Sequence, residues 1–289
     1  MPVIKTEQLT HVYAPGTHFE VTALEDVSIN IEKGDFYALV GATGSGKSTL
    51  IQHFNGLLTP TSGKLQVCGI DVTGKQIGHS LWRKVGLVFQ QPEHQLFEET
   101  VTADISFGPR NLGLPADQVD ERVIDAMKLV DLEPDKIGHM SPLSLSGGLR
   151  RKVALAGVLA IQPEVLVLDE PAAGLDPVSR NQLFERIDRL RSLKDMTVVL
   201  VTHNMEEVAR WSNRMAVLHK GRLVMNGNPR EIFSQQVPLK SYGLDVPSAV
   251  KMMLMLRSNG LAVSSDVLTV DEAVEEIIMA LPGSVKPLQ

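Results

Sequence analysis

The sequence predicts an α/β protein with a mostly parallel core sheet, because apolar strand-like runs alternate along the chain with helical patterns. Four runs have strand character, at residues 36–40, 85–89, 165–168 and 197–201. The last two are continuous and contain β-branched residues, which is typical of strands buried on both faces of a parallel sheet. Helical periodicity appears between these two at Leu183, Ile187 and Leu190, and earlier at Val119, Val123, Met127 and Val130.

The two ends of the chain have patterns of their own. Residues 10–31 form short apolar segments split by polar residues, and we interpret them as an antiparallel β layer. From about residue 238 the chain becomes methionine-rich, and Thr269 and Glu272 then form a capping box before a helical pattern. We predict one large domain over residues 1–237, with a helical subdomain at about 92–160, and a helical appendage over 238–289. Such an appendage is more often a docking surface than a catalytic unit, and we expect it to contribute a dimer contact.

Composition and charge exclude several classes of protein. Of 289 residues, 43% are hydrophobic and 21% are charged, which is ordinary for a globular protein with a real core. The net charge of −6 argues against a nucleic-acid partner, since proteins that bind nucleic acid usually carry a basic surplus. No apolar run approaches the roughly 20 residues of a spanning helix, and the first residues are too few and too polar for a signal peptide. We expect a cytosolic protein, or one held on a membrane by a partner.

A glycine-rich motif follows the first predicted core strand. Residues 41–48 read G-A-T-G-S-G-K-S and match G-x-x-x-x-G-K-[ST] at every fixed position, directly before a helical pattern. The glycines let backbone N–H groups turn toward phosphate oxygens at the positive end of that helix. Lys47 would contact the β- and γ-phosphates, and the Ser48 hydroxyl would bind Mg²⁺. The motif predicts a P-loop NTPase with an ATP site at Gly41, Ala42, Thr43, Gly44, Ser45, Gly46, Lys47, Ser48 and Thr49.

Polar residues at the ends of two later strands point to hydrolysis as well as binding. Asp169, at the tip of a buried strand, needs a compensating cation, and Mg²⁺ held through a water is the natural one. Glu170 beside it could hold and polarise the attacking water. His203 follows the strand at 197–201, so a parallel sheet would bring it to the same edge, where it could bind the γ-phosphate. An acidic pair can also cap a helix and a lone histidine can be structural, but the P-loop favours the catalytic interpretation.

A second anion-binding helix start lies about 100 residues after the P-loop. Residues 145–148 read L-S-G-G before a helical pattern, and they offer a hydroxyl and close backbone N–H groups. They resemble the signature sequence of ABC ATPases. In that family the signature closes over ATP held by the partner subunit, so the resemblance implies this role for Ser146, Gly147 and Gly148.

Other parts of the ABC pattern follow in order, and the resemblance covers roughly residues 3–235. Gln90 matches the glutamine that in the family contacts Mg²⁺ and senses the membrane partner. Asp176 falls in the D-loop, which in relatives lies across the dimer interface. Tyr13 is the candidate for stacking on adenine, with a half-buried strand tyrosine as the alternative.

A narrower resemblance is to the ATPase subunits of energy-coupling factor (ECF) transporters, and it rests on residues 89–101, 107–109 and 170–177 and on the appendage. In that family two ATPases pair beneath a transmembrane coupling protein, which works with a small substrate-binding membrane protein. The resemblance implies a peripheral protein at the cytoplasmic face of the cell membrane. It would couple Mg²⁺-dependent ATP hydrolysis to uptake of vitamins or other micronutrients, or of cobalt and nickel ions.

Two departures from the pattern affect the expected assembly. Leu149 stands where the signature usually has glutamine, and Ala172 where relatives commonly have threonine. Because Leu149 lacks an amide beside the partner's nucleotide, the composite site that uses this signature would be weaker, and we expect a heterodimer with two unequal sites. The alternatives are the ATPase of an ordinary ABC importer or exporter, a soluble ABC ATPase acting on DNA or ribosomes, and a P-loop kinase. The soluble class typically has coiled-coil insertions or two fused cassettes, and a kinase would not require residues 145–148.

Overall fold

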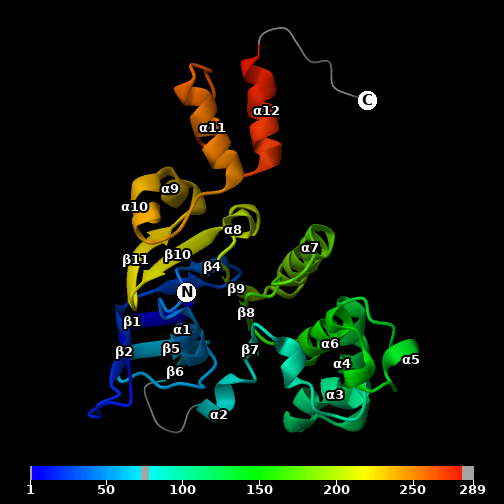
Figure 1. Cartoon of the computed structure of the whole chain (residues 1–289). Helices are drawn as coiled ribbons and strands as arrows, with labels where there is room; N and C mark the ends of the chain where they lie inside the picture. Colours follow the sequence, from blue (N-terminus) through cyan, green and yellow to red (C-terminus); the bar gives the residue numbers. More distant parts are fainter. Residues whose placement is uncertain (1, 73–77, 282–289) are drawn as a thin grey trace.

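The computed structural model describes residues 2–72 and 78–281, which form two sheets with helices around them (Figure 1). The strands are β1 (Pro2–Tyr13), β2 (Val21–Val27), β3 (Asn30–Glu32), β4 (Phe36–Val40), β5 (Ser62–Val67), β6 (Ile70–Asp71), β7 (Val85–Val88), β8 (Val165–Asp169), β9 (Thr197–Val201), β10 (Arg214–His219) and β11 (Arg222–Gly227). The α-helices are α1 (Lys47–Phe54), α2 (Gly78–Leu81), α3 (Val101–Asn111), α4 (Ala116–Leu129), α5 (Pro134–Ile137), α6 (Gly147–Ala160), α7 (Pro177–Lys194), α8 (Met205–Trp211), α9 (Pro229–Ser234), α10 (Gln236–Ser241), α11 (Ser248–Ser258) and α12 (Val270–Ala280). Two 3₁₀ helices, η1 (Pro92–Gln95) and η2 (Pro142–Ser144), complete the described elements.

The larger sheet confirms the predicted parallel core. Its strand order is β11-β10-β4-β9-β8-β7, and every neighbouring pair is parallel except β10 and β11. The strands β4, β7, β8 and β9 are buried along their whole lengths, as their continuous apolar sequences require. Because these four strands run in one direction, their carboxyl ends meet at one edge of the sheet. The chain that follows each strand starts from that edge.

The smaller sheet is antiparallel and has the order β2-β1-β5-β6, with β3 also paired to β1. The layer predicted over residues 10–31 is present, but it is larger, because it begins at Pro2 and includes β5 and β6. Strand β5 pairs with β1 across a long stretch of sequence, with Lys5 opposite Gln66, and such a pairing leaves no local pattern. Side chains of both sheets share one hydrophobic core, with Ile4 from one sheet and Val167 from the other.

The helices from η1 to α6 form a lobe beside the parallel sheet (Figure 1). Helices α3 and α4 both pack against α6. The lobe's core includes Val101, Val123 and Val153, and it continues into the sheet at Leu166 and Leu168. The lobe therefore carries the start of α6, residues 146–148, on a body that is packed against β8.

The last helices are only partly separate from the rest of the chain. Leu239, Leu244 and Val250 share a hydrophobic core with Val40 and Val208 of the sheet region. Helices α11 and α12 then project side by side (Figure 1), with a small core of their own. The predicted domain boundary between residues 237 and 238 falls inside α10, and the division into domains stays a prediction. Residues 282–289 of the predicted appendage lie outside the described residues.

The helix predicted after Thr269 is α12, and its N-terminus differs from a complete capping box. The Thr269 hydroxyl accepts the N–H of Glu272 at 3.3 Å, as expected. The Glu272 carboxylate instead accepts the N–H of Leu268 at 2.9 Å and pairs with Arg230 at 2.6 Å, which fixes α12 to α9. Among the helices of residues 2–72 and 78–281, none combines the length and apolar character needed to cross a membrane.

Candidate nucleotide-binding and catalytic site

The phosphate-binding loop, residues 41–46, is pressed against two neighbouring strands. A Cβ on Gly41 would lie 2.3 Å from the carbonyl oxygen of Leu218 in β10, and one on Gly46 would lie 2.6 Å from that of Ala23 in β2. Gly46 also has a φ of 102°, a conformation that L residues rarely adopt. Glycine at these two positions is therefore a requirement of packing and of backbone geometry.

The loop leads directly into α1, whose N-terminal end suits an anion. Its N-cap is Gly46, which makes no side-chain cap, and its first turn holds no acidic residue. Lys47 Nζ donates hydrogen bonds to the carbonyl oxygens of Gly41 at 2.8 Å and of Ala42 at 3.0 Å, so the ammonium lies over the loop. Burial lowers the pKa of Lys47, and the nearby carboxylates of Glu170 and Asp169 act in the opposite direction. The loop thus combines a positive helix end with an ammonium, the arrangement that binds polyphosphates.

Ser48 and Asp169 form a pair that fits a magnesium ion. Ser48 Oγ donates to Asp169 Oδ2 at 3.3 Å and so links α1 to the end of β8. Asp169 is buried, and burial raises the pKa of its carboxyl against the opposing effect of the Ser48 hydrogen bond. A hydroxyl and a carboxylate are hard oxygen donors of the kind Mg²⁺ prefers. In the described part of the chain no three His, Cys, Asp or Glu side chains gather as a metal cluster. Mg²⁺ commonly takes only one or two protein oxygens and completes its coordination with phosphate and water.

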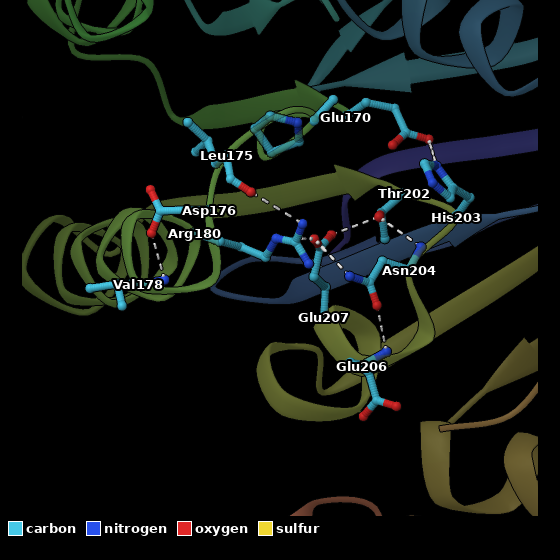
Figure 2. A network of polar contacts seen from close by, with 12 residues as sticks. Glu170, Leu175, Asp176, Val178, Arg180, Thr202, His203, Asn204, Glu206 and Glu207 are labelled. Atoms are coloured by element: carbon cyan, nitrogen blue, oxygen red, sulfur yellow. Dashed lines mark hydrogen bonds and ion pairs between the residues drawn. The ribbon is translucent and has the colours of Figure 1, made fainter. Parts of the chain in front are cut away.

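Glu170 and His203 are brought together by neighbouring strands of the sheet. Glu170 Oε1 and His203 Nδ1 are 2.7 Å apart (Figure 2). The Glu170 N–H donates to the carbonyl of Val201 at 2.9 Å, which anchors its backbone to β9. Glu170 has a φ of 51°, a left-handed conformation that is uncommon for residues other than glycine and occurs often at functional sites. The carboxylate is mostly buried and the imidazole mostly exposed, so the histidine covers the carboxylate on its solvent side.

Two cavities surround the loop and meet at Lys47. The first has a volume of about 800 Å³ and is lined by the loop, Lys47, Glu170 and His203. The second has a volume of about 450 Å³, and Tyr13 and Thr49 are among its lining residues. Tyr13 Oη lies 3.2 Å from Thr49 Oγ1, so this aromatic side chain is held beside α1. The first cavity suits the terminal phosphates, and the second contains the candidate adenine-stacking residue.

The signature residues lie apart from these cavities. Ser146 is the N-cap of α6, and its hydroxyl accepts the N–H of Leu149 at 3.4 Å. A Cβ on Gly147 or Gly148 would meet nothing within 4 Å, so this helix start faces open space. Residues 146–148 line neither of the two cavities. The chain therefore has a second helix start of the kind that suits an anion, and it lies outside the two cavities around the P-loop.

Gln90 and Asp176 also lie outside the lining of the two cavities. Gln90 is exposed and lies two residues past the end of β7. Asp176 is the N-cap of α7, where its carboxylate accepts the N–H groups of Val178 and Ser179 at 3.0 Å. The pKa of Asp176 is lowered by these contacts, chiefly by the hydrogen bond from the Ser179 hydroxyl.

Several residues between Gly243 and Lys251 also line the first cavity, and no sequence pattern predicted them. Gly243, Asp245, Ser248 and Lys251 all line it. Ser248 donates through both its backbone N–H and its hydroxyl to Glu206 Oε1, each at 2.6 Å. These residues belong to the segment predicted as an appendage, and only the tertiary fold brings them to the P-loop.

Comparison with known proteins shows the family of this chain. A family model described as ABC transporter matches residues 24–173. The energy-coupling factor transporter ATP-binding protein EcfA2 of Clostridium tetani is 47% identical over 276 residues, covering 95% of this chain and 96% of that protein. The protein of the same name in Symbiobacterium thermophilum is 48% identical over 284 residues, covering 98% of each chain. The chain belongs to the ATP-binding proteins of ECF transporters.

Solved structures of related ABC ATPases show the same fold. CbiO1 of Clostridium perfringens, described as part of the ABC transporter complex CbiONQ, matches with a TM-score of 0.73 and 34% identity, covering 83% of this chain and 94% of that one. The ATP-binding cassette MJ0796, solved as a dimer bound to ADP and phosphate, matches with a TM-score of 0.69 and 28% identity, covering 78% and 98%. The predicted fold, family and ATPase activity of this ECF-type protein are thereby confirmed.

Proposed function

We propose that this ABC ATPase is one of two unequal ATP-hydrolysing subunits of an ECF transporter. It would lie on the cytoplasmic face of the membrane and drive uptake of a vitamin or another micronutrient. The observation that carries the proposal is the Glu170–His203 pair, which lines the same cavity as Lys47. A carboxylate oriented by a histidine beside a phosphate-binding lysine can activate water, which a site for binding alone does not need.

The proposed roles follow from these contacts. Glu170 accepts the proton of the attacking water, and His203 orients the carboxylate through Nδ1 while its Nε2 remains for the γ-phosphate. Lys47 neutralises the β- and γ-phosphates. Mg²⁺ would be held by Ser48, by Gln90 and, through a water, by Asp169, and when bound it would neutralise charge on the phosphate oxygens.

Exposed apolar side chains beside two motifs support a second ATPase subunit. Leu143, next to the signature, is 74% exposed, and Val178, next to Asp176, is 65% exposed. Apolar side chains at such positions are typical of a surface that a partner covers. The open start of α6 and the dimeric form in which MJ0796 was solved agree with a partner whose ATP the signature would contact. Leu149 packs on the core of the helical lobe, and its lack of an amide supports the unequal pair.

A further exposed feature supports a membrane partner. Phe97 and Phe107 meet edge to face with ring centroids 4.9 Å apart, and both side chains are exposed. They lie on the helical lobe, in the segment that follows Gln90. An exposed aromatic pair of this kind suits a transmembrane coupling protein, which would work with a small substrate-binding membrane protein. CbiO1, a related protein of known structure, is described as part of the ABC transporter complex CbiONQ.

The proposal is tested on the tagged chain purified from membranes with the proteins that accompany it. We expect a second ATPase, a polytopic membrane protein and phosphate release that requires Mg²⁺. In this complex Glu170→Gln should keep ATP binding and lower turnover by a factor of about 10²–10⁴, the usual contribution of a general base. Glu121→Gln, an exposed change on α4, is the matched control. Normal turnover in Glu170→Gln would remove Glu170 from its role.

A further inference from the structure

A buried carboxylate next to the catalytic pair has no part in the chemistry described above. Glu207, on α8, is only 7% exposed. Its Oε2 accepts a hydrogen bond from the Thr202 hydroxyl at 2.6 Å, and its Oε1 accepts one from Asn204 Nδ2 at 3.2 Å (Figure 2). Burial raises the pKa of Glu207, and the contacts with Thr202 and Arg180 act against that effect. Burying a carboxylate is costly, so it persists where specific partners require it.

The two hydrogen-bond donors to Glu207 flank His203 in the sequence. Thr202 Oγ1 also accepts the N–H of Asn204 at 3.0 Å, and Asn204 Oδ1 caps α8 by accepting the N–H of Glu206 at 3.0 Å. The turn that carries His203 therefore has an internal hydrogen bond between Thr202 and Asn204, and the Glu207 carboxylate binds both of these residues. Since the imidazole is mostly exposed, this turn and the contact with Glu170 determine where it points.

Arg180, in the first turn of α7, lies close to the Glu207 carboxylate, but its Nε is too far away to form a hydrogen bond with it. Its Nε lies 3.6 Å from Glu207 Oε1, and this buried Nε has no hydrogen-bond partner within residues 2–72 and 78–281. Its Nη2 lies 3.5 Å from the carbonyl oxygen of Leu175, the residue before Asp176. A cavity of about 220 Å³ borders both Arg180 and Glu207, so the guanidinium has room to move. A shift of less than about 1 Å would bring Nε into hydrogen-bonding distance.

We propose that Arg180 and Glu207 are positioning residues that transmit the position of the loop at residues 174–176 to His203. The inference rests on the proposed function, in which this loop faces the second ATPase subunit. When the partner displaces the loop, the first turn of α7 moves with it, because Asp176 is its N-cap. Arg180 Nε then closes on Glu207, and the completed contact keeps the turn from moving. His203 therefore stays against Glu170, where it already lies in this structure, and faces the γ-phosphate. Hydrolysis would thereby depend on the state of the subunit interface.

The test compares ATP turnover and ATP binding in the purified complex. Arg180→Met and Glu207→Gln should each lower kcat roughly tenfold, while the Kd for ATP, measured without turnover, changes less than about twofold. The double variant should lose no more than either single variant, because both changes break one connection. Arg180→Lys keeps the charge and should recover part of kcat. Arg186→Met is the matched control, since Arg186 is on the same helix but pairs with Asp131 near the helical lobe.

Melting temperatures of all variants separate positioning from simple stabilisation. Reduced melting temperatures with wild-type kcat in the folded complex would overturn the proposal, as would additive losses in the double variant. The Arg180 side chain is partly exposed, so Arg180→Met is expected to fold. Its kcat therefore tests the proposal even if Glu207→Gln fails to fold. If Glu170→Gln abolishes turnover while Arg180→Met retains it, the connection is refuted and the proposed function stands.

Discussion

Replacing Gly46 by alanine tests whether β2 holds the phosphate-binding loop in place. Two costs add up at this position. The φ of 102° is unfavourable for an L residue by roughly 1–2 kcal/mol. The new Cβ would also lie 2.6 Å from the carbonyl oxygen of Ala23 and 2.8 Å from Leu24 Cδ2. Because Ala23 lies in β2, which pairs with β1, the start of α1 must move instead, at a cost of about 1–3 kcal/mol.

The assay is urea unfolding together with binding of a fluorescent ATP analogue. Gly113→Ala is the control, since Gly113 has a φ of 77° and its Cβ would meet nothing within 4 Å. We expect Gly46→Ala to lower the free energy of unfolding by about 2 kcal/mol more than Gly113→Ala does. ATP binding should weaken at least about tenfold, because the positive helix end shifts away from the phosphates. Equal losses of stability in the two variants with unchanged ATP affinity would refute the argument.

Three further predictions concern other parts of the chain. Lys47→Ala removes the ammonium over the loop and should weaken ATP binding at least about tenfold, and an unchanged Kd in a fluorescence titration would contradict the assigned role. Leu149→Gln should raise ATPase and transport rates of the complex, and unchanged rates would remove support for the unequal sites. Burial lowers the pKa of His53 to about 4, so this neutral histidine stabilises the fold above pH 6.5, and the contribution is lost as pH falls toward 4. At pH 5 the loss is about 2 kcal/mol, and urea unfolding of His53→Gln should show less loss of stability between pH 7 and 5 than the unsubstituted chain does.

The sequence predicted the parts of the fold that have a local pattern. Strands β4, β7, β8 and β9 are continuous apolar runs because both of their faces are buried. It did not predict β5, whose partner β1 is far away in the chain. A pairing of that kind depends on the tertiary fold and leaves no period in either segment.

The residues of the candidate site also divide into those with a local sequence pattern and those that only the tertiary fold brings together. Lys47, Asp169 and Glu170 were found because each follows a predicted strand in a recognisable motif, and His203 because its strand was clear. Arg180 and Glu207 belong to no motif that we recognised. From sequence alone, an acidic residue on a short helix is predicted to be exposed, because its packing is not known. One signal was present, since Glu207 lies between the buried residues Met205 and Val208 of α8, where an exposed charge would not be expected.

Helix α8 connects the turn that carries His203 to two other helices. It begins two residues after His203 and has only seven residues. A helix of that length is not stable alone, so its position depends on its neighbours. On one side Glu207 faces α7, and on the other Glu206 accepts both hydrogen bonds from Ser248 at the start of α11. Helix α12, which packs on α11, exposes Val270, Val274 and Ile278, a surface suited to the dimer contact predicted for the appendage. A contact made there would reach α8 through Ser248, just as one at residues 174–176 would reach it through Arg180. In the proposed function, His203 would then respond to two separate parts of one subunit interface.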